Sequence, residues 1–197
     1  HWNLRAGHYI LPFGLLNSYD TERLLLTTLE PFSLGIKLDT GLEVFGFHGP
    51  FDYAVSLSQG VGRRRLTDVD DDKLIVGRLG WDHETFTLGV SGLLGKVLQA
   101  EEAALNSGTL HEKRLAVDLT TKTLGPWILR MEGIVGGNGG PRHQTVGGGL
   151  LLADYAIRPN LELNLKAGHW QERGGRNFLG VGLNYQVIRG LYVRVAD

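Results

Sequence analysis

The chain has 197 residues, enough for a single domain over 1–197, and its 20 Lys and Arg against 21 Asp and Glu leave a net charge of -1. This balance argues against nucleic acid or an acidic substrate as the main partner. The chain has no cysteine, which excludes a disulfide framework and a thiolate metal site, and its apolar runs are far shorter than the roughly 20 residues of a transmembrane helix.

The dominant pattern along the chain is an alternation of apolar and polar residues. Segments 51–58, 114–120 and 161–168 show it most clearly, and because successive side chains of a strand point to opposite faces, each segment has one apolar and one polar face. In chain order, the predicted strands span 4–13, 40–48, 51–60, 73–81, 84–95, 113–124, 127–137, 144–157, 161–171, 177–187 and 191–197. Many have the length of about ten residues that a tilted strand needs to cross a bilayer. The predicted fold class is all-β, a transmembrane antiparallel up-and-down β-barrel.

Short and long connections alternate between these strands. The short ones lie around 49–50, 82–83, 125–126, 158–160 and 188–190, whereas the others span 14–39, 61–72, 96–112, 138–143 and 172–176. Short periplasmic turns and longer extracellular loops are typical of outer-membrane barrels. The pattern therefore predicts a bacterial outer-membrane location.

Aromatic residues cluster near the short connections. The set is Phe45, Phe47, Phe51, Tyr53, Trp81, Phe86, Trp127, Tyr155, Tyr185 and Tyr192. They predict a girdle at the membrane interface, where amphipathic rings favour the headgroup level. The alternative is that aromatic residues simply favour strands.

With the apolar face outward, the inward face collects charged residues. The predicted lumen-lining residues are Glu43, Asp52, Arg78, Arg114, Asp118, Lys122, Arg130, Glu132, Glu162, Lys166 and Arg194. A soluble barrel carrier reverses this arrangement, and a dry core with so many charges would be very costly, so we expect a hydrated lumen. The facing of 144–157 stays open, because Leu150, Leu151 and Leu152 are consecutive.

Two interpretations of the lumen charges remain open. Arg78, Arg114, Arg130 and Arg194 could form a ladder that attracts anions. Alternatively, positive and negative side chains pair across strands and stiffen the barrel. The seven histidines show no metal-ligand spacing and no nucleophile elbow is present, so we expect neither an enzyme nor a cofactor.

The segment Arg5-Ala6-Gly7-His8-Tyr9-Ile10-Leu11-Pro12-Phe13-Gly14 resembles the R-x-G-x-x-x-x-P-F-G strand of phosphate-selective-porin-like outer-membrane proteins. Segments 34–44 and 51–60 resemble the two strands that follow in that family, so the resemblance covers 4–60. It implies a large porin, often trimeric, with an anion-selective lumen and a long inward-folding or surface loop after the first strand. We carry over the porin class but no binding residues, because a lysine-rich constriction ladder is absent from the sequence.

We therefore expect a Gram-negative porin-like channel for passive diffusion of small hydrophilic solutes or ions. The alternative is a non-enzymatic structural barrel, a sleeve or anchor of a larger complex. Expected partners are outer-membrane lipid, lipopolysaccharide, small solutes or anions, and a homo-oligomer or larger membrane complex. Bacterial single-chain barrels have an even number of strands, so eleven predicted strands imply at least one more, and a barrel of twelve or more.

Overall fold

The computed structural model describes residues 1–17, 28–29, 36–61, 72–98, 109–122, 124–139, 144–172, 174–188 and 191–196. Their strands are β1 (Trp2–Ile10), β2 (Leu38–His48), β3 (Phe51–Ser58), β4 (Leu74–Asp82), β5 (Phe86–Leu98), β6 (Thr109–Thr121), β7 (Trp127–Gly139), β8 (Gln144–Arg158), β9 (Leu161–Gln171), β10 (Arg176–Ile188) and β11 (Leu191–Ala196). A short 3-10 turn, η1 (Gly14–Asn17), follows β1. Among these residues, no helix has the length and apolar character needed to cross a membrane.

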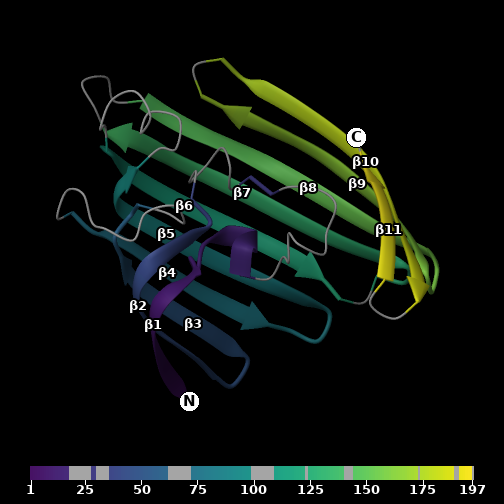
Figure 1. The fold of residues 1–197 in the computed structure, drawn as a ribbon, viewed down its shortest axis with the longest axis horizontal. Helices are drawn as coiled ribbons and strands as arrows, with labels where there is room; N and C mark the ends of the chain where they lie inside the picture. Colours follow the sequence, from purple (N-terminus) through teal and green to yellow (C-terminus); the bar gives the residue numbers. More distant parts are fainter. Residues whose placement is uncertain are drawn as a thin grey trace.

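The eleven strands form one antiparallel sheet in which each strand pairs with the next in the chain. Figure 1 shows that this sheet is strongly curved, with β1 and β11 at its two edges and η1 on its concave side. The expected all-β, up-and-down architecture is confirmed. The strand bounds agree with the predicted ranges to within a few residues at most ends.

The first strand is the main exception, because it ends at Ile10 and not at Phe13. The amide of Leu11 still donates to the carbonyl of Lys37 (3.1 Å), but Pro12 has no N–H with which to continue the ladder. The amide of Phe13 instead donates back to the carbonyl of Leu11 (2.9 Å). This tight turn takes the chain off the sheet edge and onto the concave side.

The short connections are gathered at one end of the sheet, as its up-and-down topology requires. Turns at Gly49-Pro50 and Pro159-Asn160 join β2 to β3 and β8 to β9. Gly49 has a φ of 58°, a conformation that favours glycine. The predicted turn at 188–190 falls partly outside the described residues, since 189 and 190 are not among them.

The convex face of the sheet carries a band of exposed aliphatic side chains. Its members are Leu42, Val44, Val55, Leu57, Ile75, Leu79, Val90, Leu94, Leu115, Val117, Met131, Val135, Leu151, Leu165, Leu179, Val181, Leu183, Val193 and Val195. The residues that alternate with them face the concave side, where Ser56 and Asn164, for example, are buried. Such a surface suits lipid and is the reverse of the polar exterior of a soluble barrel.

Aromatic residues border this band at the short-turn end. Phe51 lies opposite Trp81 in the β3–β4 register. The rings of Trp81 and Phe86 meet edge to face at 5.4 Å, and those of Trp127 and Tyr155 lie 4.6 Å apart. These rings follow the parity of the lipid-facing residues, which is the arrangement of an interfacial girdle.

Three aromatic residues near the short turns do not belong to that girdle. Phe45 and Phe47 share the parity of the buried Glu43, and the Arg5 guanidinium lies 5.0 Å from the Phe45 ring. The Arg194 guanidinium lies 5.1 Å from the ring of Tyr192. Strand parity therefore turns these rings to the concave face, which proximity to a turn could not indicate.

The lipid-facing assignment makes the cost of a charge depend on depth. Leu165→Arg, in the middle of β9 on the convex face, should lower the free energy of unfolding by roughly 2–4 kcal/mol in lipid vesicles. Val187→Arg, on the same face of β10 beside the short turns, should cost at most about 1 kcal/mol. Urea titration of both variants measures the difference, and equal costs would contradict a membrane-embedded convex face.

Candidate functional site: the concave face

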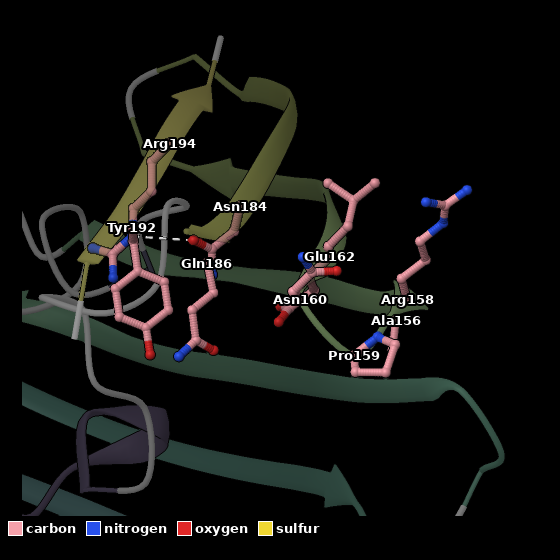
Figure 2. A pocket seen from close by; sticks show the side chains of 10 residues that line it. Ala156, Arg158, Pro159, Asn160, Glu162, Asn184, Gln186, Tyr192 and Arg194 are labelled. Atoms are coloured by element: carbon pink, nitrogen blue, oxygen red, sulfur yellow. Dashed lines mark hydrogen bonds between the residues drawn. The ribbon is translucent and has the colours of Figure 1, made fainter. Parts of the chain in front are cut away.

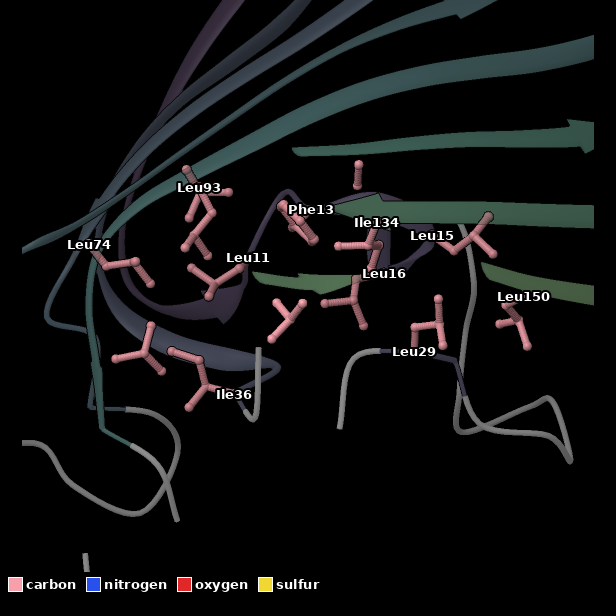
Figure 3. Packing of buried hydrophobic residues seen from close by; sticks show 14 of the residues in the cluster. Leu11, Phe13, Leu15, Leu16, Leu29, Ile36, Leu74, Leu93, Ile134 and Leu150 are labelled. Atoms are coloured by element: carbon pink, nitrogen blue, oxygen red, sulfur yellow. The ribbon is translucent and has the colours of Figure 1, made fainter. Parts of the chain in front are cut away.

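The segment that follows β1 packs on the concave face of the sheet. Its apolar side chains Leu11, Phe13, Leu15 and Leu16 are almost fully buried. Figure 3 shows them among side chains from the strands. The strand residues of this cluster include Leu74, Val76, Leu93, Val97, Ala116, Ile134, Val146, Leu150, Leu152 and Trp170. We call residues 11–17 the inward segment.

Polar contacts fix the inward segment at Gly14. The Gly14 amide donates to the Ser91 hydroxyl (2.8 Å), the Leu15 amide to the Glu132 carboxylate (2.8 Å), and Arg78 donates to the Gly14 carbonyl (2.9 Å). Gly14 has a φ of 53°, and a Cβ at this position would overlap the Glu132 carboxylate. Glycine is thus required by both the backbone conformation and the available space.

Arg78 also forms a deeply enclosed ion pair with Asp118. Its two terminal nitrogens donate to the two Asp118 oxygens at 2.5 and 2.9 Å, and both side chains are at most 5% exposed. The Asp52 carboxylate lies 3.9 Å from the Arg78 Nε. A bidentate guanidinium–carboxylate pair of this kind is among the stronger polar contacts, and removal of one partner leaves the other charge buried.

Most other concave charges are matched as well. Arg5 pairs with the buried Glu43 at 2.8 Å, and Arg130 pairs with Asp154. Lys122, just beyond the end of β6, pairs with Asp82 at the short-turn end.

Arg114 anchors a network farther from the short turns. It donates to the Gly137 carbonyl (2.7 Å) and to Asn138, and lies 3.4 Å from Glu112. Arg114 and Glu112 belong to the same strand, whereas the other ion pairs of the concave face join different strands. Arg194 likewise has a partner on the next strand, since it donates to Asn184 (3.4 Å). In the loop before β4, a hydrogen bond from Lys96 lowers the pKa of the Asp72 carboxyl.

The concave side of β8 to β11 has a different character. Asn164 donates to Asp154 (2.8 Å) and Glu162 (2.6 Å), and the Lys166 ammonium lies 5.0 Å from the Phe178 ring. A pocket of about 310 Å³ opens at the short-turn ends of these strands and is lined by polar side chains of all four strands and the β8–β9 turn (Figure 2). We call this region the polar wall.

The eleven predicted lumen residues thus share the concave side of the sheet but differ in their surroundings. Glu43, Asp52, Lys122 and Arg130 lie in the ion pairs and contacts described above. Arg78, Arg114, Asp118 and Glu132 are buried within the sheet's concave side, three of them beneath the inward segment. Glu162, Lys166 and Arg194 belong to the polar wall. Sequence reasoning missed Asp154, because three consecutive leucines left the facing of β8 open; Leu150 and Leu152 in fact face inward and Leu151 outward.

The fold has a solved counterpart, although no family model matches the chain and no curated protein matches it in sequence. The structure titled "Outer-membrane expressed OmpT of Vibrio cholerae" matches with a TM-score of 0.70 over 99% of this chain at 11% identity. The chain spans 65% of the length of that OmpT chain. The expectation that the chain has the fold of a bacterial outer-membrane β-barrel is confirmed.

The same comparison corrects one expectation. The sequence analysis expects no enzyme, because no catalytic motif is visible. The likeness to OmpT, an outer-membrane protein, overturns that exclusion. A barrel fold carries its function in particular sites, and the fold is compatible with an enzyme.

The Arg78–Asp118 pair makes a stability prediction. Arg78→Met leaves the Asp118 carboxylate and the Gly14 carbonyl without their donor, and should lower the free energy of unfolding by about 3–5 kcal/mol. The double variant Arg78→Met, Asp118→Leu removes the stranded charge and should regain much of this loss. Lys122→Met, which breaks an exposed pair, should cost at most about 1 kcal/mol. A loss as small for Arg78→Met as for Lys122→Met would contradict the role assigned to the pair.

Proposed function

We propose that the chain forms the wall of an outer-membrane channel for passive diffusion of small hydrophilic solutes. The observation that carries the proposal is the contrast between the two faces of the sheet. The convex face is an aliphatic band, whereas the concave face bears paired charges and the polar wall. Charged side chains inside a membrane-spanning sheet are favourable where they pair or line a water-filled space, and the polar wall supplies such a lining.

The proposal extends to closure of the sheet. Among the described residues, β1 and β11 are not paired with each other, and an edge in lipid leaves backbone donors and acceptors unsatisfied at several kcal/mol each. We propose that further strands pair with these edges in a barrel of twelve or more. Kinship with phosphate-selective porins, contacts with lipopolysaccharide and assembly into a homo-oligomer belong to the same proposal.

A second candidate function is a structural barrel, a sleeve or anchor of a larger complex. The inward segment favours it, because η1 packs against β5, β6 and β7 and fills the concave face there with apolar side chains. A filled interior conducts poorly. The two candidates therefore differ in a quantity that can be measured directly.

Conductance in planar lipid bilayers distinguishes them. The refolded full-length protein, with its sheet closed as proposed above, should produce discrete current steps in a salt solution, because water and ions can pass along the polar wall. Heat-modifiable migration in detergent gels serves as the control for folding. A folded, heat-modifiable protein that produces no current steps would refute the channel and support the sleeve.

The inward segment provides a graded version of this test. Gly14→Val places side-chain atoms where the Glu132 carboxylate lies, so it should displace the segment and raise the single-channel conductance. Gly49→Val is the matched control, because Gly49 has a similar φ of 58° but no atom within 4 Å of an added Cβ. Conductance should be unchanged in the control. An unchanged conductance in folded Gly14→Val would mean that the segment does not narrow the passage.

A further inference from the structure

The pocket of the polar wall combines side chains of a particular kind. Figure 2 shows Tyr192 and Gln186 side by side, with Asn160 and Glu162 across the pocket from them. Gln186 and Tyr192 are direct cross-strand partners, and the backbone amide of Gln186 donates to the backbone carbonyl of Asn160 (2.9 Å). The register of β9, β10 and β11 therefore holds the two sides of the pocket together.

The side chains that line the pocket offer both hydrogen-bond donors and hydrogen-bond acceptors. Asn160, Asn184 and Gln186 each carry an amide that can donate and accept, and Glu162 adds a carboxylate. Asn184 is the cross-strand partner of Glu162, and its side-chain oxygen accepts a hydrogen bond from the Nε of Arg194. A ligand that both donates and accepts at several points matches this mixture.

The Tyr192 ring adds an apolar surface at the same place. It is 42% exposed, and the Arg194 guanidinium lies 5.1 Å from its centre. An aromatic body with a polar tip favours ligands that have both an apolar face and hydrogen-bonding groups. The rings of sugars have this character, since C–H groups line one face and hydroxyl groups surround the edge.

An anion fits the pocket less well. The Glu162 carboxylate would repel an anion there. Of the two cations in the lining, Arg194 is engaged by Asn184 through its Nε, and Arg158 points away from Tyr192 in Figure 2. The volume of about 310 Å³ lies at the lower end of the range of small-molecule pockets, which suits one or two sugar rings.

We propose that this pocket is a binding site for a neutral sugar at the short-turn mouth of the polar wall, with Tyr192 as its stacking surface and Asn184, Gln186 and Glu162 as its hydrogen-bonding groups. The proposal deepens the channel function and rests on it for its role in passage. The binding itself requires only the folded sheet. Sugars should therefore interrupt the ion current by occupying the site.

The test uses the whole chain with sucrose as the neutral probe and succinate as the anionic one. Sucrose should produce transient interruptions of the current in planar bilayers, whereas succinate should not. Tyr192→Leu should weaken the affinity for sucrose roughly tenfold, because it removes the aromatic surface. Tyr185→Leu is the matched control, because Tyr185 is equally exposed but lies on the convex face one strand away, and it should bind like the wild type.

The possible outcomes separate this inference from the channel proposal. Current steps that sucrose does not interrupt, or that only succinate interrupts, would overturn the sugar site and leave the channel intact. If no current steps appear, titration calorimetry of the protein in detergent decides. Binding of sucrose that Tyr192→Leu weakens and Tyr185→Leu does not would support the site without a channel, and an absence of binding would overturn it.

Discussion

A strand that crosses a bilayer as part of a barrel has one face toward lipid and one face toward the barrel interior, and this constraint governs the whole molecule. Lipid offers no hydrogen-bonding partners, so the backbone must be satisfied within the sheet and the outward side chains must be apolar. Neighbouring strands pair along the whole sheet, and alternate side chains point to opposite faces, so the apolar band from Leu42 to Val195 forms on the convex face. All chemistry that the chain can perform is confined to the alternate residues on the concave face.

On that face, the buried side chain of Arg78 helps to hold the inward segment against the strands. Arg78 joins Asp118 on β6 to the Gly14 carbonyl, while Ser91 and Glu132 hold the neighbouring amides. The backbone of Gly14 and Leu15 lies off the sheet and has no strand partner, and these three side chains supply its hydrogen bonds. The apolar side chains on either side of Gly14 then bury themselves against β4 to β8. Ion pair and apolar packing thus stabilise one another.

The sequence predicts the strands well because their signal is local. An alternation such as that of residues 51–58 is visible within a few positions, and the short turns mark its ends. The inward segment is not predictable in this way, because Gly14 and Leu15 meet partners 77 and 117 positions away in the chain. Asp154 was missed for a related reason: three leucines in succession carry no alternation, so only packing of Leu150 and Leu152 reveals the facing of β8.

The division of the concave face also changes which charges can act on a solute. In the channel that we propose, Arg78 cannot set selectivity directly, because its guanidinium is engaged by Asp118 and covered by the inward segment. Only groups on the uncovered part can reach a passing molecule, and there Arg194 and Lys166 lie near Glu162, Asn164 and Asn184. Charges of both signs close together produce little net field, so they discriminate weakly between anions and cations. What such a wall can still discriminate is the pattern of hydrogen-bonding groups on a solute, and this favours recognition by shape and polarity over selection by charge.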